Sequence, residues 1–414
     1  MNDKTILVIG TFDTKNDELS YICECIKRQG GNTLSIDVSV LGEPEKPTDY
    51  SKHQVAEEGD SSISAAIESG DENTAMQIMA VGAALLVSRL YLEGKFEGLI
   101  VLGGTMGTDL ALDVTNAVPL GVPKYIVSTI SFSPLIPAGR LAADTQMILW
   151  AGGLYGLNSI CKSSLSQAAG AVLGAARAVE KPDAARPIIG MTSLGLSGLK
   201  YMSFLKPELE KRGFDVAVFH ATGMGGRAFE SLASQNAFVC VFDFCTQELG
   251  NHIHGSNISA GEDRLTNAGL RGIPQLVAPG CYDLVDIVGW QDSPQKWAEH
   301  PAHAHNRLLS SIVLDVGERR EVAHAHSRQL SSANGPVTLL LPTQGCGEWD
   351  RPGNNLHDAD GLAAFCEETI KTCPSNVDLK ILDCHINDEV FCEAALIVLD
   401  QWMLNGIVQD PLDQ

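Results

Sequence analysis

Residues 219–230 read FHATGMGGRAFE and follow directly from the apolar run Val216–Phe219. The apolar run predicts a buried parallel strand, and the residues from Ala228 to Leu232 predict a helix. A glycine-rich turn from the carboxyl end of a strand into a helix exposes backbone N–H groups at the positive end of the helix dipole. Ligands of open α/β sheets bind at that edge. We therefore predict an anion site here, in preference to a tight turn beside a solvated histidine.

The side chains around this turn add a proton carrier and an anion clamp. His220 adds an imidazole that can give or take a proton, and Arg227 presents a planar fork of N–H donors. Asp243 and Glu248 follow the next apolar run and are expected beside His220, either as an acid/base constellation or as ligands of a divalent metal. The alternative is a hydrogen-bonded structural histidine. The ligand-binding candidates within the turn are Thr222, Gly223, Gly225 and Gly226.

The composition indicates a cytoplasmic protein of more than one domain. The chain has 414 residues, of which 44% are hydrophobic, so it can bury more than one core. Its formal charge of −22 disfavours binding to nucleic acid or to anionic membranes. The 11 cysteines are scattered without a CxxC pair, which predicts reduced thiols that fill the core. We expect no nucleic-acid partner and no membrane partner.

Apolar runs alternate with helical patterns along the chain, which predicts parallel sheets with helical crossovers. Residues 181–187, with two prolines among small and charged residues, predict a linker. We predict an α/β fold of two doubly wound, Rossmann-like domains, residues 1–183 and 184–414, with a ligand-binding cleft between them. Strands are predicted at residues 5–9, 33–38, 98–102, 124–129, 188–191, 215–219, 238–242, 274–278, 337–341 and 379–382, and an exposed loop at 42–60.

The first half contains two further strand exits of the glycine-rich kind, at residues 10–15 and 103–108. Lys15 is suited to a phosphate or carboxylate, and Asp13 to a metal or a sugar hydroxyl, although both also fit a simple helix entry. Asp37 ends the second strand, where a nucleotide-binding unit presents a carboxylate to a ribose. The predicted ligand-binding residues of this half are Gly10, Thr11, Asp13, Lys15, Asp37, Gly103, Gly104, Thr105, Gly107, Thr108, Ser128 and Thr129.

These motifs, taken together, resemble the Tm-1-like ATP-binding family (the UPF0261 group). The resemblance rests on residues 10–15, 103–108, 121–129 and 219–228, with further matches at Asp263-Arg264, Gly272–Gln275, Pro279-Gly280, His305-Asn306 and Ile386–Asp388. It implies two α/β domains, a homodimer and ATP binding, which is described for a plant member that blocks viral RNA replication. It also gives His305 the best claim to function among the histidines outside the opening stretch.

The sequence departs from the family pattern at two strand exits. After Ser128-Thr129 the family usually continues Ala-Ser-Gly, whereas residues 130–134 read Ile-Ser-Phe-Ser-Pro. After Asp243 the family favours threonines, whereas residues 244–248 read Phe-Cys-Thr-Gln-Glu. We expect both segments to line the ligand site. A ligand different from the family's usual one is therefore one of the alternatives.

Two functional hypotheses follow. The first is an enzyme of the hydrolase or lyase type that binds ATP or another small anionic metabolite, with His220 as the acid/base and a divalent metal as an optional cofactor. The second is a nucleotide-binding module without turnover that regulates or sequesters a protein partner.

Overall fold

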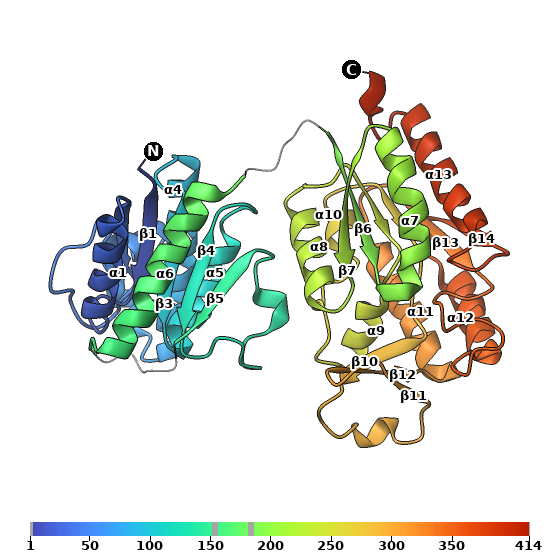
Figure 1. The fold of residues 1–414 in the computed structure, drawn as a ribbon, viewed down its shortest axis with the longest axis horizontal. Coiled ribbons are helices and arrows are strands. Elements are labelled where there is room, and N and C mark those ends of the chain that lie inside the picture. Colours follow the sequence, from blue (N-terminus) through green and yellow to red (C-terminus); the bar gives the residue numbers. More distant parts are fainter. Residues whose placement is uncertain (1–2, 151–155, 181–185, 414) are drawn as a thin grey trace. The chain divides into compact units, whose positions relative to one another are not determined.

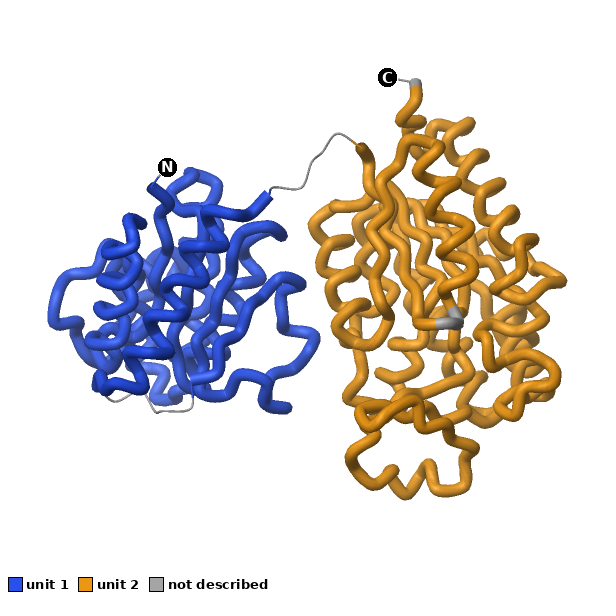
Figure 2. Tube along the Cα trace, in the orientation of Figure 1, with its two compact units in different colours: residues 1–182 blue, residues 183–414 orange. Residues whose placement is uncertain are grey.

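The computed structural model describes residues 3–150, 156–180 and 186–413, apart from the side chains of residues 196, 197 and 413. The chain divides into two compact units, residues 1–182 (unit 1) and 183–414 (unit 2), which are coloured separately in Figure 2. Residues 181–185 of the predicted linker lie outside the described residues. Each unit is a separate α/β body, and the cleft expected between the domains stays a prediction.

Unit 1 is built on a five-stranded parallel sheet in the order β2-β1-β3-β4-β5. The strands are β1 (Thr5–Gly10), β2 (Asn32–Asp37), β3 (Gly98–Gly103), β4 (Lys124–Ser128) and β5 (Thr145–Leu149). Alternate residues of β1 enter different cores, since successive side chains of a strand point to opposite faces. Ile6 and Val8 belong to one apolar cluster, and Leu7 and Ile9 belong to another.

Helices cover both faces of this sheet. Figure 1 shows α1 and α6 side by side in front of it, where they pack over Ile6 and Val8. Helices α4 and α5 pack on the opposite face, over Leu7 and Ile9. The helices are α1 (Asn16–Arg28), α2 (Lys52–Glu58), α3 (Ile63–Glu68), α4 (Glu72–Leu92), α5 (Thr105–Asn116) and α6 (Ser159–Ala178), with a 3-10 turn at Ala138–Arg140.

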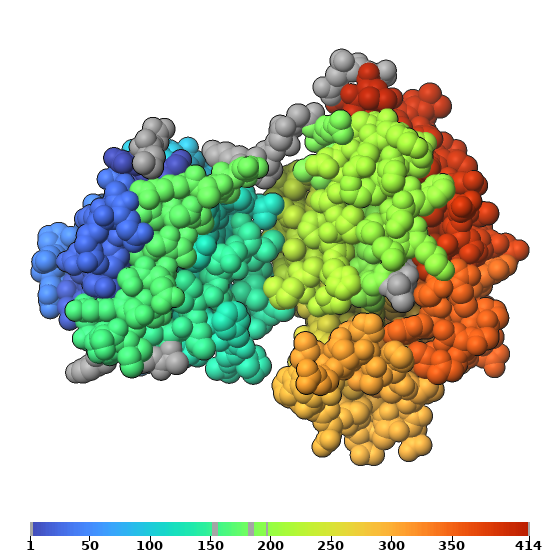
Figure 3. Space-filling model, viewed as in Figure 1, coloured from blue at the N-terminus to red at the C-terminus, as the bar shows by residue number. Residues whose placement is uncertain are grey.

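Unit 2 contains a six-stranded parallel sheet and a small antiparallel sheet. The large sheet has the order β14-β13-β9-β8-β6-β7, with β6 (Ile188–Ser193), β7 (Asp215–His220), β8 (Cys240–Asp243), β9 (Gln275–Val277), β13 (Val337–Pro342) and β14 (Val377–Leu382). The small sheet has the order β10-β12-β11, with β10 (Leu284–Val288), β11 (Ala302–Ala304) and β12 (Leu309–Val313). The small sheet and its loops form the orange projection at the lower end of this unit in Figures 1 and 3.

The helices of unit 2 also lie on both faces of the large sheet. Tyr201 of α7 and Phe391 of α13 pack over Ile189 and Met191. Phe229 of α8 packs with Val241 in a separate cluster. The helices are α7 (Gly195–Lys211), α8 (Met224–Ser234), α9 (Gln247–Ile253), α10 (Asn267–Leu270), α11 (Val316–Ser331), α12 (Ala359–Thr372) and α13 (Glu389–Leu404), with 3-10 turns at Gln295–Trp297 and Pro411–Asp413.

The predicted fold class is confirmed, and every predicted strand is present within a few residues of its expected bounds. Three features differ from the prediction. The expected loop at 42–60 contains α2, which begins with a capping box formed by Ser51 and Gln54. Strand β5 was not predicted, although residues 147–149 are apolar, and its side chains are half-buried or exposed. The small sheet was also not predicted.

In both large sheets the order in which successive strands are added reverses at the first strand. In unit 1 the first strand, β1, lies between β2 and β3, and in unit 2 the first strand, β6, lies between β7 and β8. Such a reversal is the topological switch point at which doubly wound folds bind their ligands, outside the carboxyl ends of the strands. The topology therefore directs attention to one edge of each sheet.

Among the described residues, α4 is the one helix long and apolar enough to span a membrane by length and composition. Half of the residues in its most apolar window are buried within the structure.

Candidate functional site

A hollow of about 630 Å³ lies at the switch point of unit 1. Eight of the predicted ligand-binding residues line it: Thr11, Asp13, Lys15, Gly103, Gly104, Thr105, Gly107 and Thr129. They come from the exits of β1, β3 and β4, which the parallel sheet brings to one edge. The two glycine-rich turns of the first half thus face the same space.

The first turn of α5 has backbone N–H groups that are not hydrogen-bonded within the described residues. The N-cap residue is Gly104, which has no side chain to accept a hydrogen bond. The N–H groups of Thr105, Met106 and Gly107 donate to no acceptor within the described ranges. The N–H of Thr108 donates to the Gly104 carbonyl at 2.8 Å. Gly103 permits this tight entry, because an added Cβ would lie 2.5 Å from the Gly107 Cα. Unpaired N–H groups at a helix start attract anions.

Lys15 supplies the positive side chain of this hollow. It is half-buried and forms no ion pair with any acid in the described part of the chain. Asp13, at the same rim, accepts a hydrogen bond from the Gly42 N–H at 3.1 Å. The apolar side chains that also line the hollow are Val38, Val40, Leu41, Met76 and Met106. A neighbouring hollow of about 520 Å³, lined in part by Arg140, shares Met76, Thr105 and Met106 with it.

The remaining predicted residues of the first half have structural positions outside this hollow. Asp37 is 1% exposed, and its carboxylate accepts from the N–H groups of Phe12 at 3.1 Å and Ser39 at 3.0 Å, so it fixes the β1 exit and does not face the hollow. The hydroxyls of Thr108 and Ser128 bond each other at 2.6 Å. At Gly10, an added Cβ would lie 2.8 Å from Leu19 Cδ1.

In unit 2, the two carboxylates expected beside His220 bind an arginine instead. Arg264 is fully buried and donates to both oxygens of Asp243, at 2.5 and 2.7 Å, and to Glu248 at 2.9 Å. A third buried carboxylate, Glu230, accepts from Arg264 at 3.1 Å. Burial raises the pKa of Glu230 to about 7 and also raises the pKa of Glu248. These four residues form the Arg264 network.

Glu248 also occupies the anion position of the glycine-rich turn. Its Oε1 accepts from the N–H groups of Gly223 at 2.6 Å and Gly226 at 3.0 Å, at the start of α8. An added Cβ at Gly226 would lie 1.7 Å from Glu248 Oε2, so glycine is required there for the carboxylate to approach. The opening prediction of an external anion at this turn therefore differs from the structure, in which a side chain of the protein fills the position.

Arg227 and Gly225 have local roles as well. The Arg227 guanidinium donates to both oxygens of Asp263, at 2.6 and 2.9 Å, and its side chain is 13% exposed. The expected anion clamp is thus paired within unit 2. At Gly225 an added Cβ would lie 1.7 Å from the His220 carbonyl oxygen, which explains the glycine by close backbone approach.

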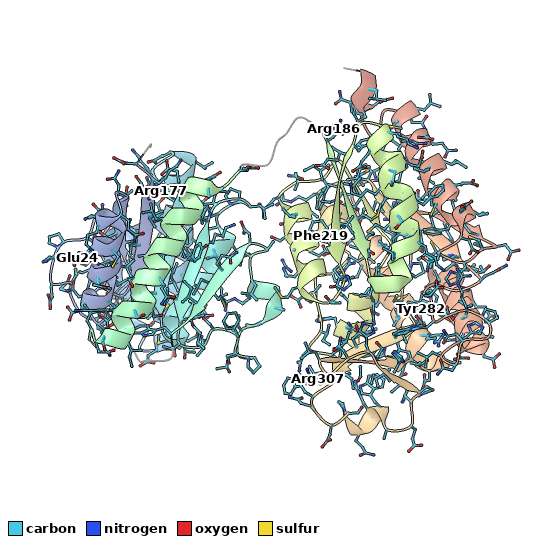
Figure 4. The ribbon with its side chains drawn as sticks, in the orientation of Figure 1. Glu24, Arg177, Arg186, Phe219, Tyr282 and Arg307 are labelled. Carbon is cyan, nitrogen blue, oxygen red and sulfur yellow. The ribbon has the colours of Figure 1, made fainter. Side chains whose placement is uncertain are left out.

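His220 ends β7 and lines a hollow of about 260 Å³ together with Thr222. Figure 4 labels the preceding residue, Phe219, whose ring lies 5.6 Å from the Phe229 ring. The alternation of side chains along a strand then directs His220 away from that aromatic cluster. No hydrogen bond within the described residues joins the His220 ring to Asp243 or Glu248, so the expected constellation is not assembled.

The carboxylate that this hollow does contain is Asp286 of β10. Asp286 is 1% exposed and accepts from the Ser311 hydroxyl at 2.6 Å. Burial raises the pKa of Asp286, while Ser311, Gln247, His305 and His220 act to lower it. Asp286 was not predicted as a site residue, because it lies inside an apolar run that belongs to the unpredicted small sheet. His305, which the family motif had favoured, lines the same hollow.

Potential metal ligands meet elsewhere. Among the described residues, one group of three has donor atoms within 4.8 Å of one another, namely His300, Asp315 and Glu318. Asp315 and Glu318 form the capping box of α11, and His300 lies 3.0 Å from the Glu318 carboxylate. Helix capping accounts for this geometry, and the metal expected beside His220 stays a prediction.

The fold and the hollows define a class of protein, with two Rossmann-like parallel-sheet units that each have a hollow at the switch point. The chain belongs to the UPF0261 family. The model of "Uncharacterised protein family (UPF0261) N-terminal domain" matches residues 4–181, and that of the C-terminal domain matches residues 186–403. The resemblance seen in the sequence motifs is thereby confirmed.

Two relatives and one solved structure illustrate the similarity. A UPF0261 protein of Brucella melitensis is 54% identical over 98% of this chain and 97% of its own length. The ToMV resistance protein Tm-1 of Solanum lycopersicum is 27% identical, over 95% of this chain and 55% of the tomato protein. A crystal structure of UDP-N-acetylglucosamine 2-epimerase aligns with 72% of this chain and 82% of its own, at 10% identity and a TM-score of 0.23, which is too low to bear on function.

Proposed function

We propose that unit 1 binds a nucleotide or another phosphorylated small molecule in the hollow at its switch point. The observation that carries the proposal is that two glycine-rich turns, Lys15 and the open start of α5 line one space of about 630 Å³. The sheet order 2-1-3-4-5 is the one in which flavodoxin-like folds hold a phosphorylated cofactor at the junction of the first and third strands.

Each part of the hollow suits a part of such a ligand. The N–H groups of Thr105, Met106 and Gly107 and the Lys15 ammonium match phosphate oxygens. The wall formed by Val40, Met76 and Met106 offers apolar surface to a base. This division explains why an acidic chain of formal charge −22 would still accept an anion locally.

The hollow in unit 1 is suited to binding rather than to turnover. The described lining of this hollow contains no histidine or cysteine, and Asp13 is held by the Gly42 N–H. The hydrolase or lyase hypothesis keeps His220 but lacks the two carboxylates expected beside it. The tomato relative is named a ToMV resistance protein, which is compatible with the second hypothesis, a nucleotide-binding module that acts on a protein partner.

The test is calorimetric titration of the full chain with ATP, ADP, AMP and inorganic phosphate. We expect Lys15→Ala to weaken the binding of ATP about 10- to 100-fold, since a hydrogen bond to a charged group contributes about 1.5–3 kcal/mol. The matched control is Lys27→Ala, an exposed lysine in the last turn of α1 that does not line the hollow, whereas Lys15 is the N-cap residue of that helix. Absence of binding by all four probes would refute the proposal, as would equal affinities in the two variants. Release of phosphate from ATP would instead favour the enzyme.

A further inference from the structure

The hollow in unit 2 has the features of a second, chemically different binding site. Its volume of about 260 Å³ is below the roughly 300–1,000 Å³ of pockets that hold drug-sized ligands, so it suits a small molecule. It lies beside the exits of β6 and β7 and under the small antiparallel sheet. Its polar lining includes His220, Thr222, Gln247, Asp286, His305 and Ser311.

Gln247 indicates that the hollow is built to hold a polar guest. The residue is 1% exposed and lines the hollow, where its side chain lies close enough to Asp286 to lower the pKa of that carboxyl, yet neither its amide oxygen nor its amide nitrogen forms a hydrogen bond of normal geometry with another described residue. A buried amide without partners is costly, and native proteins keep few of them. A ligand with both donor and acceptor groups would satisfy the Gln247 amide.

The other polar groups of the hollow also include both hydrogen-bond donors and hydrogen-bond acceptors. Asp286 is an acceptor with Ser311 already bound at 2.6 Å, Thr222 both donates and accepts, and the rings of His220 and His305 offer nitrogen atoms at the exposed side. Such a mixture matches hydroxyl groups, each of which donates one hydrogen bond and accepts two.

The charge of the lining argues against an acid as the guest. No lysine or arginine is among the lining residues, and Asp286 is a buried carboxyl that would repel a carboxylate or phosphate. Apolar surface is supplied by Leu284, Leu309 and Trp349, whose ring centroid lies 6.2 Å from that of His305. An aromatic and aliphatic wall opposite polar groups suits the C–H faces of a sugar ring.

We propose that this hollow binds a small, uncharged polyhydroxylated molecule of the sugar or polyol class, with Gln247 and Asp286 as its principal hydrogen-bonding residues. The site is independent of the phosphate site proposed for unit 1, because the two hollows share no residue.

The experiment titrates the full chain with D-ribose, D-xylose, D-glucose and glycerol, and separately with D-gluconate and L-lactate, by calorimetry and saturation-transfer NMR. We expect at least one of the uncharged probes to bind, and Gln247→Leu and Asp286→Asn each to weaken it at least tenfold. The matched control Asp360→Asn changes an exposed aspartate of α12 and should leave binding unchanged. Binding of ATP should be the same in all these variants, which separates this proposal from that for unit 1.

Gln247→Leu gives a second readout that a purely structural role would not produce. Leucine removes the unpaired buried amide, so the free variant should unfold at a higher temperature than the original chain while its affinity for the sugar falls. Loss of affinity together with a lower unfolding temperature in both variants would indicate damage to the fold and overturn the assignment of the two residues. Failure of every uncharged probe, or binding of the two acids alone, would overturn the ligand class.

Discussion

Replacing Arg264 with methionine would test whether the Arg264 network holds unit 2 together. Methionine keeps an unbranched chain of similar reach but removes the cation from Asp243, Glu248 and Glu230, all of which are 1% exposed or less. Removing one partner of a buried ion pair typically costs about 3–5 kcal/mol, because the remaining charge is left uncompensated. Because three buried carboxylates lose their cation at once, we expect the loss of unfolding free energy to lie at the upper end of that range. The matched control is Arg227→Met, whose single partner, Asp263, is 33% exposed, and the expected loss there is about 1 kcal/mol.

The assay is urea unfolding followed by tryptophan fluorescence, since Trp290, Trp297, Trp349 and Trp402 lie in unit 2 and Trp150 alone lies in unit 1. The measurement at pH 7.5 is repeated at pH 5. A buried carboxyl without a cation has a folded pKa above its unfolded value, so the folded state binds more protons and the variant regains stability as the pH falls. Equal losses in the two variants, or a loss in the Arg264 variant that does not change with pH, would refute the reasoning.

Three further outcomes are expected. Gly226→Ala should unfold at lower urea than the original chain, because its Cβ would meet Glu248 Oε2 at 1.7 Å, whereas Gly174→Ala in α6, where the Cβ meets nothing within 4 Å, should gain about 1 kcal/mol. Burial lowers the pKa of His326 from 6.5 to about 4, so only the unfolded chain binds a proton between these pH values. The free energy of unfolding should therefore fall by about 3 kcal/mol as the pH drops through that window. His326→Gln should abolish this part of the pH dependence, measured by urea unfolding. Thiol labelling of the folded chain, read by mass spectrometry, should modify the partly exposed Cys23 and Cys373 first, and modification of the nine buried cysteines at the same rate would contradict the structure.

The sequence predicted the large sheets well because their strands are continuous apolar runs that end in glycine or polar residues. Runs such as Thr5–Ile9 and Val337–Leu341 are buried on both faces and admit few other interpretations. The small sheet lacks that signal, since every residue of β11 is exposed and β10 contains a buried aspartate, and β5 was not predicted although residues 147–149 are apolar. Pairing with a neighbouring strand, which is a tertiary property, determines these elements.

The sequence predicted the parts of the candidate site that depend on where strands end. It did not predict which charged side chains pair with one another. The turns at residues 10–15 and 103–108 converge because parallel strands end at one edge of a sheet. The assignment of Asp243 and Glu248 to His220 failed because Arg264, 21 and 16 residues further along the chain, reaches both of them. Nothing in the local sequence distinguishes a carboxylate that awaits a ligand from one that already has an arginine.

Glu248 has a practical consequence for crystallography of this family. Helices α5 and α8 both follow a glycine-rich turn, but the second already carries a tethered carboxylate on its first amides. Sulfate or selenate in a crystallisation drop should therefore give electron density at the beginning of α5 and none at the beginning of α8. The same soak would supply an anomalous scatterer at a known place in unit 1.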